Sequence, residues 1–291
     1  MKIITKVIIP AAGFGTRFLP QTKAMPKEML PIVDKPVIQY VVEEAVSAGI
    51  EDVIIVTGYT KRSIEDHFDS PNADLVKNLE MGKKHQLLEE IKHISEMANF
   101  IYIRQKGPYG NATPIKSSRH LIGNEPFLVL WGDDFVVAEP SRAQQMIDAY
   151  KKYETTILCG IITNKKEDAE RYAFVKGKNL GNGVWKVDKL IEKPGWHNTP
   201  SNLAIVSGYI LTPDIFPILD LQKPGKGGEY YLPEAIDILA KKHPVYAIEI
   251  KNGRYYDTGN KFEYMKTVVE MALKHKDING DFRHFLKNLK I

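Results

Sequence analysis

Residues 7–17 have the sequence VIIPAAGFGTR, an apolar run that passes directly into a loop of small residues. The run from Val7 to Pro10 has the composition of a short buried strand. Small residues in the loop, with glycines at 13 and 15, let backbone N–H groups approach an anion at the end of a first parallel strand. The segment therefore predicts an α/β fold with a phosphate-binding loop at the carboxyl edge of its sheet.

The loop differs from two common phosphate-binding motifs. It lacks the full G-x-G-x-x-G spacing because residue 18 is Phe, and no Gly-Lys-Ser/Thr follows as in a P-loop. These departures disfavour dinucleotide oxidoreductases and P-loop kinases. Three cations, Arg17, Lys23 and Lys27, stand among prolines that stiffen the segment, and they could offset the charge of a triphosphate. A solvated basic loop is the alternative.

The order of expected elements indicates one α/β unit. In the first half, buried strands alternate with helices as in a Rossmann-type nucleotide-binding half: strands at 7–10, 53–57, 100–104 and 127–131, and helices at 36–48, 74–81 and 83–97. After a helix at 141–153 the chain becomes strand-rich: strands at 155–163, 172–176, 184–192 and 203–211, then a helix at 231–242, a strand at 245–250 and a helix at 261–274. The turn residues 179–183 predict a β-hairpin lying over the sheet. We expect a mixed, mostly parallel sheet flanked by helices, with this hairpin portion and C-terminal helices.

Composition excludes several classes of protein. The chain has 291 residues, 43% of them hydrophobic, and a net charge of +4, which is too small to argue for a nucleic-acid partner. The one cysteine, Cys159, lies in an apolar stretch, so it is expected to be a packed strand thiol in a reducing compartment. No window approaches the roughly 18 apolar residues of a membrane span. A cytoplasmic protein without a membrane partner is expected.

Two acidic residues, Asp133 and Asp134, follow the apolar run 127–131. Mg²⁺ is held by one or two carboxylates together with substrate phosphates, so a strand end of this kind is a candidate site. A turn or a helix cap is the alternative. The eight histidines include no pair at ligand spacing with a third ligand, so no zinc site is expected.

Residues 10–50 closely resemble the signature of the bacterial UTP:glucose-1-phosphate uridylyltransferases, which are nucleoside-diphosphate-sugar pyrophosphorylases. Weaker matches continue to about residue 270. The resemblance implies that Arg17 and Lys27 are catalytic cations at the nucleotide phosphates and that Glu28 lies near the base. It also implies a nucleotide-binding loop made of Ala11, Ala12, Gly13, Gly15 and Thr16.

Further motifs carry the resemblance to the metal and the sugar. Asp133 matches the principal Mg²⁺ ligand and Asp257 a second one, with an N-cap for the helix after Gly259 as the alternative for Asp257. The run 191–194, Ile-Glu-Lys-Pro, is similar to a Glu-Lys-Pro motif. In that motif Glu192 would hold sugar hydroxyls and Lys193 the sugar phosphate, as a carboxylate acceptor and a mobile point charge can do.

Other segments match only in part. Gln105 and Gly110 resemble the segment that reads the base, but the Leu-Gly-His that usually follows is Asn-Ala-Thr at 111–113, before Pro114. At 207–209 the chain has Ser-Gly-Tyr where the family has Gly-Arg-Tyr, and Gly208 is carried over as sugar-binding. The Gly-Gly-Glu at 227–229 resembles a loop in the sugar wall.

The resemblance implies in-line attack by a sugar 1-phosphate on the α-phosphate of a nucleoside triphosphate, with Mg²⁺ and release of pyrophosphate. UTP and glucose 1-phosphate are the expected substrates, giving UDP-glucose. Because of the departure at 111–114, dTTP with glucose 1-phosphate and UTP with an amino-sugar phosphate stay open. A non-catalytic nucleotide-sugar sensor is the alternative from another class. We expect one catalytic domain at 1–275, with a nucleotide part at 1–140, a sugar-phosphate part at 141–260 and a tail at 276–291. A homodimer or homotetramer is implied.

Overall fold

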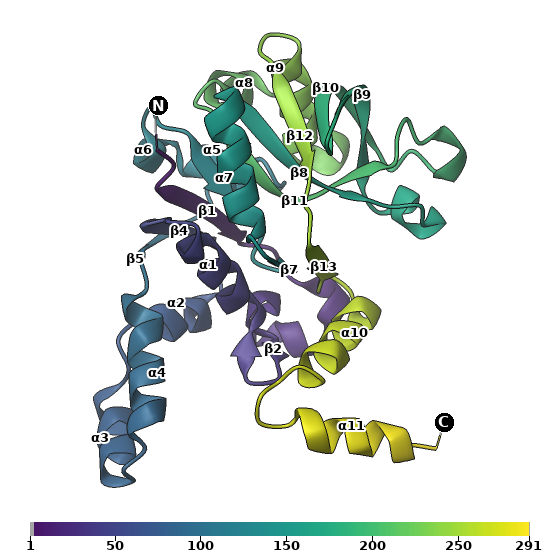
Figure 1. The fold of residues 1–291 in the computed structure, drawn as a ribbon. Coiled ribbons are helices and arrows are strands. Elements are labelled where there is room, and N and C mark those ends of the chain that lie inside the picture. Colours follow the sequence, from purple (N-terminus) through teal and green to yellow (C-terminus); the bar gives the residue numbers. More distant parts are fainter. Residues whose placement is uncertain (1–2, 291) are drawn as a thin grey trace.

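The computed structural model describes residues 3–290 and is built on one nine-stranded sheet (Figure 1). The strands lie in the order β5-β4-β1-β6-β11-β8-β12-β10-β9. Their bounds are β1 Lys6–Ala11, β4 Asp52–Thr57, β5 Asn99–Arg104, β6 Phe127–Val129, β8 Thr156–Ile162, β9 Ala173–Gly181, β10 Val184–Glu192, β11 Leu203–Leu211 and β12 Val245–Glu249. The predicted mixed α/β fold is confirmed.

The N-terminal half of the sheet is parallel. β1 pairs with β4 and β6, and β4 pairs with β5. The register sets Ala11 opposite Thr57, and Thr57 opposite Arg104. The carboxyl ends of three strands therefore lie level at one edge, where a ligand crevice is expected in such sheets.

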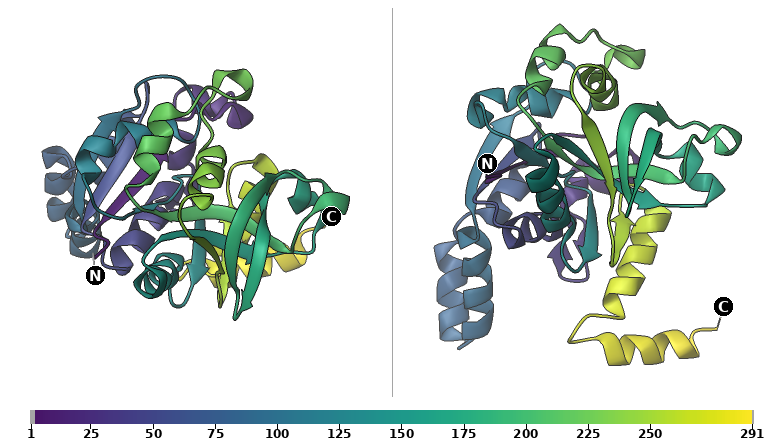
Figure 2. Two further views of the ribbon diagram at one scale, coloured as in Figure 1. Left: turned by 90° about the horizontal axis from the view of Figure 1, so that it is seen from above. Right: turned by 45° about the horizontal axis from the view of Figure 1, so that its top comes forward.

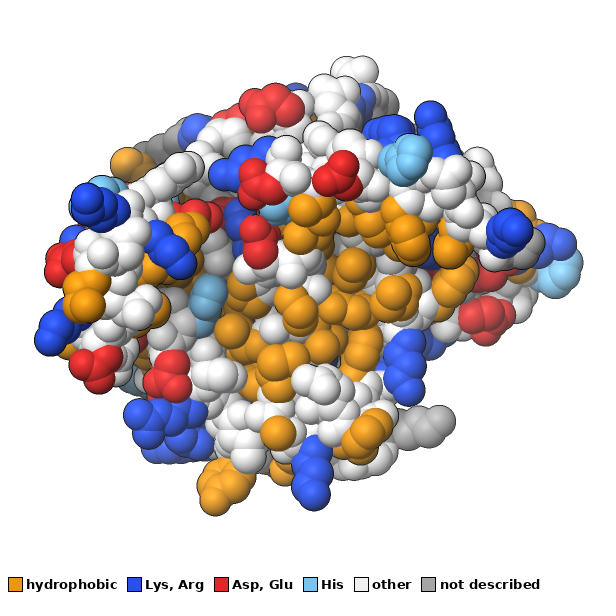
Figure 3. Space-filling model, turned by 90° about the horizontal axis from the view of Figure 1, so that it is seen from below, with side chains coloured by type: hydrophobic (Ala, Val, Ile, Leu, Met, Phe, Trp, Pro, Cys, Tyr) orange, Lys and Arg blue, Asp and Glu red, His pale blue; other side chains and the backbone are white. Residues whose placement is uncertain are grey.

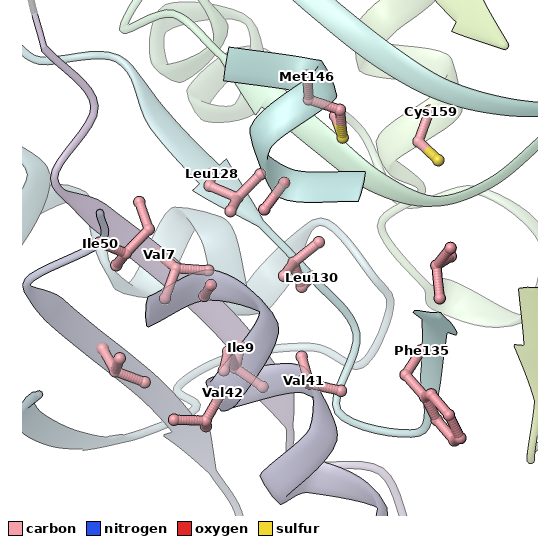
Figure 4. Close-up of a cluster of buried hydrophobic side chains, with 14 of the residues drawn as sticks. Val7, Ile9, Val41, Val42, Ile50, Leu128, Leu130, Phe135, Met146 and Cys159 are labelled. Atoms are coloured by element: carbon pink, nitrogen blue, oxygen red, sulfur yellow. The ribbon is translucent and has the colours of Figure 1, made fainter. Parts of the chain in front are cut away.

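Two apolar cores cover the two faces of the sheet. Alternate residues of β1 point to opposite sides, so Val7 and Ile9 join one core while Ile8 joins the other. The first core is closed by α1 (Val37–Ser47) and α7 (Arg142–Tyr153), as Figure 4 shows for Val41, Val42 and Met146. The second is closed by α5 (Thr113–Ser117), α6 (Arg119–Ile122), α8 (Ile215–Leu221) and α9 (Leu232–Ala240). Apolar residues cover both faces of the parallel strands, as their near-continuous hydrophobic sequences require.

The C-terminal half of the sheet is largely antiparallel. β11 runs antiparallel to both β6 and β8, and β12 runs parallel to β8. The predicted turn between β9 and β10 is confirmed, with positive φ at Gly181, Asn182 and Gly183. The prediction that this hairpin lies over the sheet as a separate layer is wrong. β10 pairs with β12, and β9 also pairs with β11, so backbone hydrogen bonds make the hairpin part of the sheet itself (Figure 2).

A small second sheet was not predicted. β7 (Asp134–Ala138) pairs antiparallel with β13 (Gly253–Asp257), with Asp134 directly opposite Asp257. Stacking of Phe135 on Tyr256 supports the pairing. This sheet brings together two acidic segments that lie more than a hundred residues apart in the sequence.

The remaining elements lie around the edges. A two-stranded ribbon consists of β2 (Pro31–Ile32) and β3 (Lys35–Pro36). α2 (Arg62–Phe68), α3 (Ala73–Met81) and α4 (His85–Glu96) extend away from the sheet on one side, and α10 (Lys261–Ala272) and α11 (Asn279–Asn288) on another (Figure 1). Cys159 is buried in β8, as predicted. Within residues 3–290, no helix has the length and apolar character needed to cross a bilayer.

Candidate active site

Two adjoining cavities open at the carboxyl edge of the parallel strands. The first cavity, of about 450 Å³, is lined by Pro10 of β1, by residues 12–16 of the loop after β1, by residues of the 105–114 segment, and by Lys27 and Glu28. The second cavity, of about 370 Å³, is lined by residues from β10 and β11 and by the segments 170–173 and 255–260. Asn111, Trp131 and Asp133 line both cavities, so a ligand in one would lie beside a ligand in the other.

The loop after β1 has the open geometry that the sequence predicts. Ala12, Gly13, Gly15 and Thr16 line the first cavity, whereas Ala11 is the buried last residue of β1 and is not part of the lining. Gly15 has φ 64°, a conformation that favours glycine, and its carbonyl accepts a hydrogen bond from Thr22 Oγ1 at 2.7 Å. The loop is therefore fixed by its own contacts before any anion arrives.

Of the three predicted cations, Lys27 and Arg17 line a cavity and Lys23 does not. Lys27 Nζ lies 2.5 Å from Asp133 Oδ2 at the border of the cavities. Burial lowers the pKa of Lys27, but the carboxylates of Asp133 and Glu28 more than offset this and raise it to about 12, so the ammonium group is fully charged. Arg17 lines the second cavity and donates to the Gly259 carbonyl at 3.3 Å. Lys23 is exposed and lines neither cavity.

Glu28 lines the first cavity and has a buried partner that the sequence analysis missed. Its side chain is 1% exposed and accepts a hydrogen bond from Lys61 Nζ at 2.7 Å, and Lys61 is also buried. Burial raises the pKa of the Glu28 carboxyl, while Lys61 and Lys27 act in the opposite direction. Lys61 follows the end of β4, and its place after a buried parallel strand was the available signal.

Asp133, Asp257 and Arg17 converge on one point beside Gly259. A Cβ on Gly259 would lie 3.0 Å from Asp257 Oδ1, 3.7 Å from Asp133 Oδ2 and 3.8 Å from Arg17 Nη1. Because Gly259 has no side chain, no atom from this position stands between the three groups. Two hydrogen bonds fix Asp133 and Asp257 in these positions. Thr258 Oγ1 donates to the Asp133 carbonyl at 2.6 Å, and Gly259 N donates to Asp257 Oδ1 at 2.7 Å.

The helix-cap alternatives to a metal role lose support here, whereas Asp133 does lie in a turn, as the other alternative for it expects. The N-cap of α10 is Asn260, whose side chain accepts from the Glu263 N–H, so Asp257 does not cap the helix. Asp133 precedes a strand rather than a helix. Among residues 3–290, no group of three or more His, Cys, Asp or Glu side chains could hold a metal ion. Two carboxylates beside a phosphate site nevertheless fit Mg²⁺, which draws its other ligands from phosphates and water.

Asp134 and Asp257 each have an arginine partner that the sequence did not reveal. Arg171 forms an ion pair with Asp257, and the Tyr172 hydroxyl lies 3.4 Å from the same carboxylate. Burial, opposed by Arg142 and reinforced by Asp133, raises the pKa of Asp134 to about 7. Asp134 is therefore the poorer candidate ligand, which leaves Asp133 as the better one.

The sugar-side residues lie at the second cavity. Glu192 and Lys193 line it, are each 55% exposed and lie 3.6 Å apart, so both are available to a ligand. Ser207 and Tyr209 line the cavity, but Gly208 between them does not. The backbone at Gly208 has φ 125°, and a Cβ there would lie 2.8 Å from Cys159 Cβ, so packing alone requires glycine at this position.

The segment expected to read a base lies at the first cavity. Gln105 and Gly110 both line it. A Cβ on Gly110 would collide with the backbone of Tyr230, and φ is 128°. Asn111 Oδ1 accepts from Leu232 N at 2.7 Å, which ties the divergent 111–114 segment to the start of α9. Glu229 lines the first cavity and not the second, whereas the sequence placed its loop on the sugar side.

Comparison with known proteins identifies the family. Residues 6–273 match the family model described as nucleotidyl transferase. The chain belongs to the nucleotidyltransferase family. The UTP–glucose-1-phosphate uridylyltransferase of Staphylococcus epidermidis is 46% identical over 291 residues, which is 100% of both chains. The Bacillus subtilis protein of the same name is 47% identical over 290 residues, covering 99% of this chain and 98% of that protein.

Solved structures agree with the family assignment. A UDP-glucose pyrophosphorylase complexed with UDP-glucose superposes on this nucleotidyltransferase with a TM-score of 0.85 at 42% identity, covering 94% of this chain and 100% of the other. A UTP-bound enzyme of the same kind from Acinetobacter baumannii gives a TM-score of 0.90 at 33% identity, covering 99% and 100%. The predicted family and enzyme class are confirmed.

Proposed function

We propose that this nucleotidyltransferase forms UDP-glucose and pyrophosphate from UTP and glucose 1-phosphate. The observation that carries the proposal is that Asp133 lies at the border of the two cavities, with Asp257 and Arg17 beside it in the second cavity. That border is where the phosphates of two substrates must come together. Uridylyltransferase relatives at 46% and 47% identity over nearly full length support the choice of substrates.

The first cavity takes the nucleotide. Its loop after β1 offers backbone N–H groups, and Lys27 stands at the phosphate end. Gln105 also lines this cavity, and its amide can both donate to and accept from a uracil edge. The second cavity takes the sugar phosphate, with Glu192 for sugar hydroxyls and Lys193 for the phosphate. In this assignment Gly208 shapes the sugar wall through its neighbours Ser207 and Tyr209.

The reaction is a direct in-line displacement. A phosphate oxygen of the sugar 1-phosphate attacks the α-phosphorus of UTP, a new P–O bond forms, and the bond to the pyrophosphate leaving group breaks. The nucleophile is already an anion at neutral pH, so no residue has to remove a proton. The chain's own task is to position two anions and to neutralise their charge with Arg17, Lys27 and Lys193. Mg²⁺, held by Asp133 and Asp257, would supply Lewis-acid stabilisation of the phosphate oxygens.

Three further candidates differ in substrate or in chemistry. The divergent 111–114 segment borders both cavities through Asn111, so dTTP in place of UTP, or an amino-sugar phosphate in place of glucose 1-phosphate, uses the same mechanism. A nucleotide-sugar sensor would keep the cavities and lose the reaction. The converged carboxylates and Arg17 favour catalysis over the sensor.

The proposal also covers the domain organisation, the cellular location and the oligomeric state of the enzyme. We assign residues 1–275 to one catalytic domain, with a nucleotide part at 1–140 and a sugar-phosphate part at 141–260, and residues 276–291 to a tail. The protein acts in the cytoplasm, without nucleic acid or membrane, as a homodimer or homotetramer. Supporting self-association, α11 has no buried residue, and α10 and α11 carry exposed apolar side chains, among them Phe262, Met265, Phe285 and Leu289. Apolar side chains also gather on the lower face of the molecule (Figure 3).

Gly259→Ala tests the convergence point. The added methyl group would occupy the point that lies 3.0 Å from Asp257 Oδ1 and 3.7 Å from Asp133 Oδ2. We expect the half-saturating Mg²⁺ concentration to rise about tenfold to a hundredfold, the range seen when groups around a metal are disturbed. A titration of pyrophosphate release against Mg²⁺ measures it. The matched control is Gly280→Ala in α11, where a Cβ meets nothing within 4 Å. Equal Mg²⁺ dependence in both variants would remove this point from the metal site.

A further inference from the structure

Arg142 is a fully buried cation that the reaction described above does not use. It is the first residue of α7 and is 0% exposed. Its Nε and Nη2 donate to the two carboxylate oxygens of Glu44 in α1, at 2.9 and 2.8 Å. Its Nη1 donates to Asp134 Oδ1 at 3.3 Å and to the Ser207 carbonyl at 2.8 Å. One guanidinium group thus connects α1, β7 and β11.

Two of these contacts lead directly to the active site. Asp134 is the neighbour of Asp133, and its Oδ2 lies 3.4 Å from the hydroxyl of Tyr255 in β13, the strand that ends at Asp257. Ser207 lines the second cavity, and its Oγ accepts a hydrogen bond from Trp131 N at 3.1 Å. Trp131 lines both cavities. The guanidinium therefore fixes the turn that carries Asp133 against the wall of the second cavity.

Arg142 is packed closely against β11 at Gly208. A Cβ at Gly208 would lie 2.8 Å from Cys159 Cβ, 3.1 Å from Met146 Sδ and 3.4 Å from Arg142 Cδ. Met146 and Cys159 lie side by side in the core (Figure 4). The space that a side chain from position 208 would enter is therefore occupied in part by Arg142, which leaves the arginine little freedom to move.

We propose that Arg142 is a positioning residue, which holds Asp134 so that Asp133 faces the reacting phosphates. The inference rests on the proposed metal role of Asp133. A guanidinium can make these four hydrogen bonds at once because its donors have a rigid, planar arrangement. A lysine has a single nitrogen and cannot reach Glu44, Asp134 and Ser207 together.

Arg142→Lys is the test, since it keeps the buried charge. We expect the half-saturating Mg²⁺ concentration to rise about tenfold or more and kcat to fall by a similar factor, as for other residues that orient metal ligands. The KM for UTP should change less than kcat, because Arg142 does not line the first cavity. Ile147→Ala, on the same helix and 7% exposed, is the control: it should lower the Tm and leave the Mg²⁺ dependence unchanged.

Two results would overturn the positioning role. One is a folded Arg142→Lys enzyme with the Mg²⁺ dependence and kcat of the parent. The other is an Arg142→Lys enzyme whose Tm falls while its Mg²⁺ dependence and kcat stay unchanged, as expected for the Ile147→Ala control. These outcomes differ from a failure of the metal assignment, which would show as an Asp133→Asn enzyme with unaltered Mg²⁺ dependence. If Asp133→Asn abolishes the Mg²⁺ response and Arg142→Lys does not shift it, the inference about Arg142 alone fails.

Discussion

Replacing Asp133 by asparagine should lower kcat about a thousandfold while leaving the fold intact. Asp133 Oδ2 faces the point shared with Asp257 and Arg17, so its charge contributes directly to binding the cation between the two substrates. Loss of a group that stabilises transition-state charge by about 4 kcal/mol corresponds to a factor of about 10³ in rate. The amide oxygen can still accept from Lys27, which preserves the local structure. Initial rates of pyrophosphate release at saturating substrates measure the effect.

A matched control distinguishes the loss of a catalytic group from the mere loss of one negative charge. Asp188→Asn removes an exposed carboxylate from β10, outside both cavities, and should leave kcat and the Mg²⁺ dependence unchanged. Circular dichroism and Tm should be close to the parent for both variants. An Asp133→Asn enzyme with full activity and an ordinary Mg²⁺ response would exclude Asp133 from the metal site.

Lys193→Gln should raise the KM for glucose 1-phosphate about a hundredfold and leave the KM for UTP nearly unchanged. Lys193 is half exposed and lines the second cavity, and among residues 3–290 its ammonium group has only Glu192, 3.6 Å away, as an ion-pair partner. A hydrogen bond to a charged group contributes about 1.5–3 kcal/mol, which is a factor of roughly 10 to 150 in affinity. Glutamine keeps much of the side-chain length and removes the charge. Steady-state kinetics with each substrate varied in turn measure both constants.

Lys189→Gln provides the comparison for this variant. Lys189 is an exposed lysine on the same strand, β10, and lines neither cavity. It should behave like the parent. Should Lys193→Gln raise the KM for UTP instead, the two cavities would have to exchange their assignments.

The parallel half of the fold was predictable because its strands are short runs of buried residues. Val7 to Ile9 and Val53 to Val56 are almost fully buried, and continuous apolar composition is the signal of strands covered on both faces. Residues that follow such strands meet at one edge, so Gly13, Gln105 and Asp133 could be grouped from the sequence. The position of the loop after β1 was predictable for the same reason, because the loop directly follows a buried strand.

What the sequence could not show depends on pairing between distant segments. β7 and β13 are five-residue strands whose partner lies more than a hundred residues away, and nothing local indicates that Asp134 stands opposite Asp257. The hairpin β9–β10 joins the sheet because β10 pairs with β12 and β9 pairs with β11. These pairings also depend on the tertiary fold and leave no local signal in the sequence. Sequence patterns report burial along one strand, not the identity of its neighbour.

The cations missed at the site have a common cause. Lys61, Arg142 and Arg171 each bind a carboxylate from another part of the chain, at Glu28, at Glu44 and Asp134, and at Asp257 respectively. In the sequence they are ordinary charged residues near the start of a helix or strand. Buried charges require partners, so each acidic residue at a cavity floor predicts a nearby cation without identifying it.

Pyrophosphate release with glucose 1-phosphate and Mg²⁺, compared among UTP, dTTP, ATP, CTP and GTP under identical conditions, tests the central claim most directly. The account predicts rapid release with UTP and a clear preference over the other four nucleotides. Preference for dTTP would contradict the base assignment and leave the mechanism in place. Binding of UTP without release of pyrophosphate, with glucose 1-phosphate and with amino-sugar phosphates alike, would contradict the claim that the protein is a uridylyltransferase.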